Sequence, residues 1–549
     1  MNNRMDLSTA YIRRTLEKFS IILAAVIGLL ILLNSVLFGN QVHAGIEESS
    51  EVTALSSAMP NQGWGPLQVN FSAFGSYAND TRIVRYEWDL DGNGQYDYDA
   101  SSQQGYANYL YTKPGEYTIF LRVTDELGRY STDSVQITVR HPGSSSVDYW
   151  TIFDDSRVRR IDISISQTDW DQMWLNPEAK YQSRVDATIF GDTLEDVGFR
   201  MRGQFSMRES GQKKPWKIDT DAYIAGQEYF NLRQLVLINN INDPSLIREK
   251  LAYEMMAFAG LPASHVAFIE LWIDINDNDQ GPLFWGVYSL VERVDNKYLS
   301  NRFGRGSKGG NLYKASHAQR GPMDLIYYGE DIADYPSVNG HVAYGKMNNE
   351  EENDYSDIIS LCRVVDGTQY NSDQEMLQAF ESVINVDAFI RYMAVITILD
   401  NWDSYPNTGN NYYLFNNPVT GRFEWIPWDL AWGENTQAAL IPTAGSELIQ
   451  RAPLLDQVFR VSEYRLRYLA YVDLLLHNWF TEENIVELAS VYHQMIVPYL
   501  KQTSGDQAFY GEKPMFSPQS IDDAWLALSE FTKKRHLFLS NELKKISIP

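Results

Sequence analysis

The amino-acid sequence predicts a multidomain protein in which a small β-sandwich precedes a larger α+β domain with a helical C-terminal part. Residues 50–141 contain short alternating strands separated by turns, as in all-β sandwiches. Residues 148–440 combine strand-rich segments with a helical one, which is typical of an α+β domain. In residues 441–549, apolar side chains recur with the 3.6-residue period of helices.

The first 44 residues have the composition of a targeting segment. An apolar run over residues 19–38 is followed by the small residue Ala44, and four basic residues come before it: Arg4, Arg13, Arg14 and Lys18. This order predicts a signal peptide that is cleaved near Ala44. The apolar run is also long enough to span a bilayer, so an uncleaved membrane anchor is the alternative.

The composition argues against several classes of protein. A net charge of -25 and a pI near 4.7 suit a chain that does not bind nucleic acid by neutralising phosphates. Cys362 is the only cysteine, so no intramolecular disulfide is possible, and we expect it to be a buried apolar residue. The eight histidines lack the spacing of zinc ligands.

Residues 45–66 are rich in small and polar side chains, and we interpret them as a linker leading into the sandwich. Tyr86–Asp89, Pro114–Tyr117 and Val123–Asp125, set among the short strands, resemble the PKD (polycystic kidney disease) domain. That domain is an immunoglobulin-like module of cell-surface proteins. The resemblance implies a role in adhesion or spacing rather than in chemistry.

One loop of this module has the spacing of a calcium-binding loop. Four side chains carry the oxygen ligands: Asp89, Asp91, Asn93 and Asp97. Gly94 permits the sharp turn of such loops, but Ala100 stands where their bidentate Glu is found. The alternative is a hairpin of Asx-turns without a metal ion.

Residues 400–433 place two groups of carboxylate and amide side chains at one end of a predicted β-hairpin. Residues 411–415 and 422–426 are rich in aromatic and β-branched side chains, and the residues between them favour a turn. The hairpin therefore brings the residues before its first strand close to those after its second, with paired positions about 5 Å apart.

This convergence joins four side chains: Asp403, Asn410, Asn411 and Asp429. A divalent cation that binds phosphate oxygens is held by a few oxygen ligands of the protein, which leave room for water and substrate. The alternative is that these residues cap turns and the start of a helix.

A second region supplies positive charge. Residues 198–219 run from a strand-like segment through a Gly- and Ser-containing loop into Lys213, Lys214 and Lys217. Backbone N–H groups and lysine ammonium groups are suitable partners for a polyphosphate.

Five ordered segments resemble the spore-coat protein H (CotH) kinase-like family over roughly residues 155–440. They are residues 198–219, 286–295, 310–314, 400–415 and 426–430. The family is an atypical, secreted, protein-kinase-like group. The resemblance implies transfer of phosphate from ATP, with Mg²⁺ or Mn²⁺, to Ser or Thr of a protein.

The resemblance also implies roles for individual residues. Asp403 would orient or deprotonate the acceptor hydroxyl, and the metal would be held by Asp429 with Asn411 or its neighbour Asn410. The nucleotide would be bound by Lys214, with Lys217 as the less certain candidate, by Arg202 and Gly203 of the loop, and by Glu292. Ala431 replaces a second Asp that commonly follows in the family, which weakens the case for two metal ions.

We therefore expect an exported kinase, secreted or held at the cell envelope, acting on a protein that is basic and rich in Ser and Thr. A surface protein or a polysaccharide is a further expected partner, and contact with a membrane is expected only through residues 19–38 if they are retained. The alternative function is a surface adhesion or scaffold protein that binds partners without turnover.

Overall fold

The computed structural model describes residues 51–141, 148–209, 213–276, 281–367, 369–442, 451–501 and 518–546. The targeting segment expected over residues 1–44 lies outside these ranges, as do residues 142–147. Among the described residues, no helix combines the length and apolar character needed to cross a membrane.

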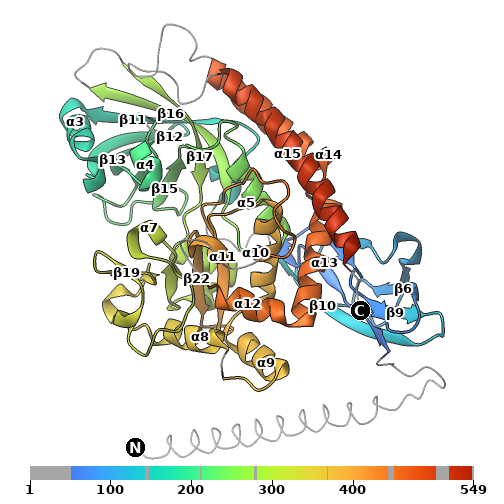
Figure 1. Cartoon of the computed structure of the whole chain (residues 1–549). Coiled ribbons are helices and arrows are strands. Elements are labelled where there is room, and N and C mark those ends of the chain that lie inside the picture. Colours follow the sequence, from blue (N-terminus) through green and yellow to red (C-terminus); the bar gives the residue numbers. More distant parts are fainter. Residues whose placement is uncertain are drawn as a thin grey trace, which may run out of the picture.

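The N-terminal part is a β-sandwich, as predicted (Figure 1). One sheet has the strand order β3-β10-β9-β6-β7 and the other β2-β4-β8, while β1 pairs with β5. The strands are β1 (Val52–Thr53), β2 (Ser57–Met59), β3 (Gln62–Trp64), β4 (Leu67–Ser72), β5 (Tyr77–Ala78), β6 (Ile83–Asp89), β7 (Tyr98–Asp99), β8 (Ala107–Tyr111), β9 (Gly115–Asp125) and β10 (Tyr130–Arg140). A short 3-10 turn, η1 (Ser101–Gln103), precedes β8.

The segment 45–66, expected as a linker and entry to the sandwich, contains β1, β2 and β3 within residues 52–64, so its described part already belongs to the sandwich expected from residue 50. These strands are only two or three residues long, so no alternation of apolar and polar side chains marks them in the sequence. These strands form because they pair with other strands of the sandwich: Met59 lies opposite Asn70, and Trp64 lies beside Arg140.

The larger domain begins with a closed barrel of seven strands in the order β11-β12-β13-β14-β15-β17-β16. They are β11 (Arg159–Ser166), β12 (Ser183–Ile189), β13 (Asp192–Met201), β14 (Trp216–Asp219), β15 (Gln234–Ile238), β16 (Val266–Asn276) and β17 (Leu283–Val291). Short helices α2 (Tyr149–Ile152), α3 (Gln167–Leu175) and α4 (Phe205–Glu209) accompany the barrel. Apolar side chains from β13 and β14, including Phe199 and Trp216, belong to its core.

A four-stranded sheet follows, in the order β21-β18-β22-β23. Its strands are β18 (Leu312–Lys314), β21 (Gly345–Lys346), β22 (Tyr412–Asn417) and β23 (Arg422–Pro427), and a small pair is formed by β19 (Ser337–Val338) and β20 (His341–Val342). The predicted hairpin is confirmed, since Tyr412 pairs with Pro427 and Asn417 with Arg422.

Helices surround this sheet: α5 (Arg248–Phe258), α6 (Asn296–Phe303), α7 (His317–Arg320), α8 (Ser356–Asp366), α9 (Asp373–Val383), α10 (Val386–Ile398) and α11 (Tyr405–Thr408). The C-terminal part is helical as predicted, with α12 (Pro453–Arg460), α13 (Ser462–Asn478), α14 (Glu482–Lys501) and α15 (Pro518–Lys545). Figure 1 shows α14 and α15 running alongside each other from the barrel to the sandwich. Cys362 is buried on α8, as expected.

The sandwich packs directly on the helices of the larger domain. Met59 of β2 belongs to the same apolar core as residues of α5, α10 and α13. Gln62 donates a hydrogen bond to the carbonyl of Gly260 (2.6 Å). Tyr106 donates one to Asp473 of α13 (2.6 Å), and its ring stacks on His477 at 4.2 Å between centroids. The two parts therefore share one packed interface.

Candidate functional site

The hairpin brings the predicted carboxylate and amide side chains together. Asn411 Nδ2 donates a hydrogen bond to Asp403 Oδ2 (2.8 Å) and a second one to the Asp403 carbonyl (3.0 Å). Thr408 donates to Asp403 Oδ1 (2.8 Å), and Asn410 contacts the same oxygen (3.3 Å). Asp403 is thereby held in one orientation while its side chain stays partly open to solvent.

Asp429 lies directly after the second strand of the hairpin, on backbone with φ of +52°. Its N–H donates to the Tyr253 hydroxyl of α5 (3.0 Å). Burial within the surrounding protein raises the pKa of Asp429, the nearby positive charges of Arg202 and Lys314 oppose this, and the charge of Asp403 adds to it. The side chain of Asp429 is nonetheless exposed to solvent, so a ligand can reach its carboxylate from outside.

Glu249, in the first turn of α5, faces the same place. It is 8% exposed, and burial, followed by the negative charge of Asp429, raises its pKa well above the usual range. Among the described residues, no hydrogen bond or ion pair joins the carboxylate of Glu249 or that of Asp429 to another side chain. Two such carboxylates side by side favour a bound cation or a proton.

The opposite wall of the cleft is positively charged. On the outer face of the barrel, Arg200 of β13 pairs directly with Lys217 of β14, while the neighbouring Phe199 and Trp216 belong to the core. Lys217 forms an ion pair with Asp219 (2.7 Å). Burial, together with the charges of Arg200 and Arg293, lowers the pKa of Lys217.

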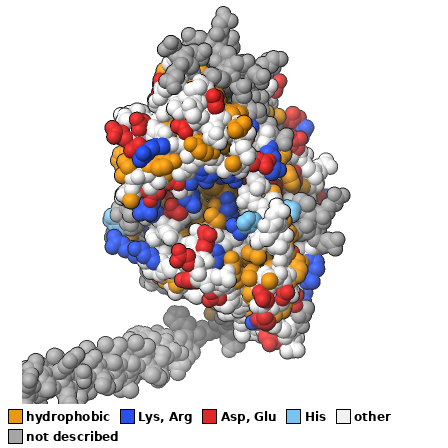
Figure 2. Space-filling model, turned by 90° about the vertical axis from the view of Figure 1, so that its left-hand side faces the viewer, with side chains coloured by type: hydrophobic (Ala, Val, Ile, Leu, Met, Phe, Trp, Pro, Cys, Tyr) orange, Lys and Arg blue, Asp and Glu red, His pale blue; other side chains and the backbone are white. Residues whose placement is uncertain are grey.

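Lys314 of β18 completes this wall. Burial, followed by the positive charges of Arg202, Arg293 and Lys180, lowers its pKa to about 8. Figure 2 shows a hollow between the barrel and the part of the molecule below it, with Lys and Arg side chains gathered along its upper wall. The cleft thus has cationic walls above a floor of carboxylates, an arrangement that suits a polyphosphate and its metal ion.

The donor set on the floor fits a hard divalent cation. Asp429 and Glu249 supply carboxylate oxygens, and Asn411 supplies an amide oxygen whose nitrogen is already bonded to Asp403. The amide oxygen of Asn410 accepts a hydrogen bond from the N–H of His317 (3.0 Å), so Asn411 is the better placed of the two. The described residues contain no cluster of three His, Cys, Asp or Glu that could hold a metal, so substrate and water would have to complete the coordination.

Lys213 and Lys214 lie before β14, at one end of the barrel. Lys214 Nζ is buried and donates to the carbonyl of Met207, beside the ring of Trp174. Lys213 Nζ donates to the carbonyl of Asn239 (3.2 Å), and burial lowers its pKa to about 7. Lys217 lies among the positive charges of Arg200 and Arg293, and the nucleotide roles of Lys214 and Lys217 both stay predictions.

The remaining predicted nucleotide residues lie in two different places. Arg202 lies near Asp429 and Lys314. Gly203 has φ of +79°, and a Cβ there would meet Ser206 Oγ at 2.5 Å, so the turn requires glycine. Glu292, by contrast, is 2% exposed and forms a buried ion pair with Arg302 (2.7 Å).

The predicted calcium loop folds as a series of Asx-turns. Asp89 accepts hydrogen bonds from the N–H groups of Gly92 (2.9 Å), Asn93 (3.1 Å) and Gly94 (2.7 Å). The side-chain oxygens of Asp91 and Asn93 accept similar bonds from the N–H groups two residues ahead. The carboxylates of Asp89 and Asp91 each keep a further lone pair besides these bonds, and the calcium site over Asp89, Asp91, Asn93 and Asp97 stays a prediction of the sequence.

Three residues of the cleft were not identified from the sequence: Glu249, Arg293 and Lys314. No strand pattern marked Arg293, because β17 ends at Val291 and its last seven residues are all buried. The charge of Arg293 acts on Lys217 and Lys314. Nothing in the spacing pointed to Glu249, whose place depends on how α5 packs under the hairpin.

Comparison with known families gives two matches. The CotH kinase protein model matches residues 199–539, and the PKD domain model matches residues 58–139. The first match begins later than the resemblance seen in the sequence and extends almost 100 residues further, through α13 and most of α15. The C-terminal helices are therefore part of the CotH kinase domain.

Two curated relatives agree with the first match. The inner spore coat protein H of Bacillus subtilis is 24% identical over 311 residues, which cover 56% of this chain and 78% of that protein. The invasin CotH3 of Rhizopus delemar is 21% identical over 330 residues, and the match covers 56% of this chain but only 50% of the invasin. Among solved structures, the PKD1 domain of Vibrio anguillarum Epp shares 28% identity, with a TM-score of 0.14, and covers 17% of this chain and 100% of that domain.

Proposed function

The chain belongs to the CotH kinase protein family, and from this premise we propose that it is an exported atypical protein kinase. It transfers the γ-phosphate of ATP to Ser or Thr of a surface or secreted protein. The observation that carries the proposal is the placement of Asp403, fixed by Asn411 (2.8 Å), next to the Asp429 carboxylate across from a wall of Arg and Lys. Kinase chemistry requires this combination of positioning and electrostatics.

Each part of the cleft has a task in this reaction. Arg202, Lys217 and Lys314 bind the phosphate oxygens and offset their charge. Asp403 accepts a hydrogen bond from the acceptor hydroxyl and takes its proton as the new P–O bond forms and the bond to the ADP leaving group breaks. Thr408 and Asn411 keep the Asp403 carboxylate aimed at that hydroxyl.

Asp429, Asn411 and Glu249 would hold the Mg²⁺ or Mn²⁺ ion. When bound, the ion neutralises charge on the phosphates and orients them. Burial and the charge of Asp429 raise the pKa of Glu249, and a bound cation would favour the ionised form of this carboxyl. No calcium ion is assigned a part in this reaction.

The proposal includes location and partners. Two relatives are named as a spore coat protein and an invasin, and the chain carries a PKD domain, which together support a position at the cell surface or outside the cell. The acceptor protein is proposed to be basic and rich in Ser and Thr, because the enzyme is strongly acidic overall.

Transfer of labelled phosphate tests the proposal. The exported chain is incubated with γ-labelled ATP and a basic Ser/Thr-rich protein, with Mg²⁺ or Mn²⁺ in separate reactions, and phosphoamino-acid analysis identifies the acceptor. Label on Ser or Thr, dependent on the metal, is the expected result. If no protein is labelled while ATP still binds, the chain uses its cleft only to bind.

That second outcome corresponds to a surface adhesion or scaffold protein. Two observations favour it: Ala431 stands where the family commonly has another Asp, and Lys214 is bonded to the carbonyl of Met207. A scaffold would bind the nucleotide and a partner protein without turnover.

A further inference from the structure

Two hollows lie next to each other where the sandwich meets the helical part. The first, of about 420 Å³, is lined by the β4–β8 region, the η1 turn and the C-terminal end of α13. The second, of about 430 Å³, is lined by residues from the loop after β4 and from β6. Gln104 and Tyr106 line both, so the two hollows adjoin at these residues, and we call the two together the depression. The volume of each hollow falls within the range of roughly 300–1,000 Å³ that is typical of ligand-binding pockets.

The depression is uncharged in a highly charged protein. Its lining residues, all in described parts of the chain, include no Asp, Glu, Lys or Arg, although 21% of the chain is charged. A charged ligand would lose hydration here without gaining a counter-charge. The lining therefore selects an uncharged ligand.

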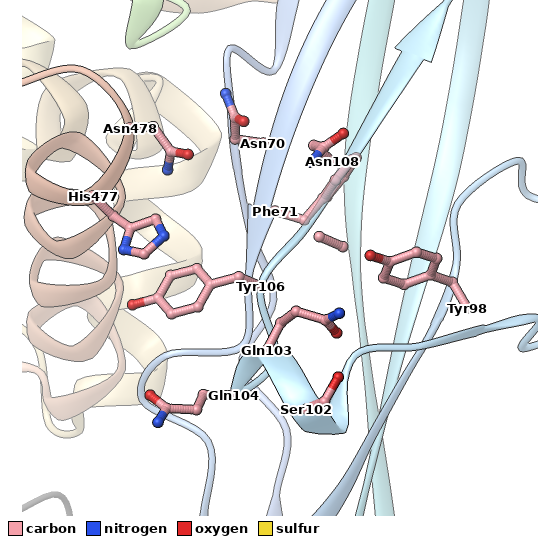
Figure 3. Close-up of a pocket in the computed structure, with 11 residues that line it drawn as sticks. Asn70, Phe71, Tyr98, Ser102, Gln103, Gln104, Tyr106, Asn108, His477 and Asn478 are labelled. Atoms are coloured by element: carbon pink, nitrogen blue, oxygen red, sulfur yellow. The ribbon is translucent and has the colours of Figure 1, made fainter. Parts of the chain in front are cut away.

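The polar part of the first hollow consists mainly of carboxamides. They are Asn70, Gln103, Gln104, Asn108 and Asn478. Asn70 and Asn478 each donate one bond to a backbone carbonyl, and Asn108 accepts one from Gln68. A carboxamide has two N–H donors and two acceptor lone pairs, so each keeps a donor and an acceptor, which match two neighbouring hydroxyl groups. Figure 3 shows Gln103 between Tyr98 on one side and His477 and Asn478 of α13 on the other.

Aromatic rings supply the complementary apolar surface. Tyr98 lines the first hollow, Phe74 and Tyr86 line the second, and Tyr106 lies between the two. The stacking of Tyr106 on His477 and its hydrogen bond to Asp473 fix that ring before any ligand arrives. The free face of an aromatic ring packs well against the C–H face of a sugar. Because the ring is already held in place, less entropy is lost when the ligand binds.

We propose that this junction between the sandwich and α13 is a binding site for an uncharged glycan, with a chain of neutral sugars seated along both hollows. The carboxamides of the first hollow bind the hydroxyl groups, and the rings of both hollows pack on the sugar faces. A peptide is the less suitable ligand, because peptide grooves use deep apolar pockets for side-chain anchors or a paired strand edge. This proposal does not depend on phosphate transfer.

Affinity electrophoresis of the full-length exported chain tests the proposal. Native gels contain laminarin, hydroxyethylcellulose or galactomannan as neutral probes, and alginate as the anionic comparison. We expect at least one neutral polysaccharide to retard the protein, and alginate to leave its mobility unchanged. Gln103→Ala and Tyr98→Ala should weaken the retardation at least tenfold, and Ser102→Trp, which fills the mouth of the hollow, should abolish it.

Gln136→Ala is the matched control, because Gln136 is an exposed carboxamide of β10 that lies outside both hollows. It should be retarded like the wild type, and equal melting temperatures should show that all variants are folded. Retardation by alginate alone, by no neutral probe, or equally in wild type and the folded Ser102→Trp variant would overturn the proposal. Capture of peptides from an array that Ser102→Trp abolishes, without glycan binding, would assign the depression to a peptide instead.

Discussion

Arg391 Nη1 donates a hydrogen bond of 2.8 Å to the carbonyl of Ala58, and this bond joins helix α10 of the kinase domain to strand β2 of the sandwich. The same guanidinium donates to the Tyr471 hydroxyl (2.9 Å) and forms an ion pair with Asp387 (2.7 Å). Arg391 is 1% exposed. One buried cation therefore connects the sandwich, α10 and α13.

We expect Arg391→Ala to destabilise the whole protein by about 3 kcal/mol, because it leaves Asp387 and the Ala58 carbonyl without their partner. Urea unfolding measures the change, with Arg465→Ala, an exposed arginine on α13, as the control. The prediction fails if both variants unfold at the same urea concentration.

Substitutions at Asp403 and Asp429 should affect phosphate transfer in different ways. Asp403→Ala is expected to lower turnover by roughly 10²–10⁴ while leaving ATP binding largely intact, which is the usual effect of losing a positioned base. Asp429→Ala should instead weaken metal-dependent ATP binding, because the cation loses a main protein ligand. Calorimetric titration with ATP, with and without Mg²⁺, and labelled-phosphate transfer give the two readouts.

Asp171→Ala provides the control for these variants, since Asp171 is exposed on α3 and should behave like the wild type. Identical ATP affinity of Asp429→Ala and wild type in Mg²⁺ would contradict the assignment of the metal site.

Lys217 and Lys214 can be distinguished by comparing binding with stability. Lys217→Ala should weaken ATP binding through the loss of a positive charge beside Arg200 and Arg293, and it should also cost some stability because its ion pair with Asp219 is largely buried. Lys214→Ala should lower the melting temperature as well, because its ammonium group is bonded inside the protein to the carbonyl of Met207. ATP titration and thermal unfolding of both variants decide the matter. The assignment of phosphate binding to Lys217 is wrong if only Lys214→Ala lowers affinity.

The interface should also make stability depend on pH through Asp473. Burial raises the pKa of Asp473 to about 6, whereas the hydrogen bond from Tyr106 opposes the shift. Between about pH 4 and 6 the folded protein therefore holds a proton that the unfolded chain has released, so this group's contribution to stability falls as the pH rises. Asp473→Asn keeps an acceptor for Tyr106 and removes the titration.

The free energy of unfolding of Asp473→Asn minus that of the wild type should be larger at pH 7 than at pH 4. We expect this increase to reach up to about 3 kcal/mol. Urea unfolding of both proteins across this range measures it, and the contribution from His477 cancels in the comparison. A difference that does not change with pH would show that Asp473 titrates normally.

Local patterns predicted the parts of the fold and site that depend on local structure. The hairpin of β22 and β23 follows from its turn residues and side-chain alternation, and the approach of Asp429 to Asp403 follows from the hairpin. Strand alternation also predicts the direction of Lys217. Its neighbours Trp216 and Ile218 point into the core, so Lys217 points to the outer face of the barrel. The closure of seven strands into a barrel could not be predicted, since it depends on pairings between distant segments.

The position of Glu249 in the site could not be predicted from local sequence patterns either. Its helix was predicted from apolar periodicity, and the structure begins that helix at Arg248. Which face of the helix lies under the hairpin is decided by tertiary packing, through contacts such as that of Tyr253 with the backbone of Asp429. A single sequence carries no spacing rule for that contact.

The shared core around Met59 limits how this architecture can be recombined. A module joined to its neighbour only by a flexible tether can be exchanged for a homologue or deleted without harm to the rest. Here Met59 packs with residues of α5, α10 and α13, so removing the sandwich would expose apolar surface and leave Arg391 without its Ala58 partner. A chimaera with another PKD domain would have to transplant the matching surface of the helices, and the two parts must be inherited together.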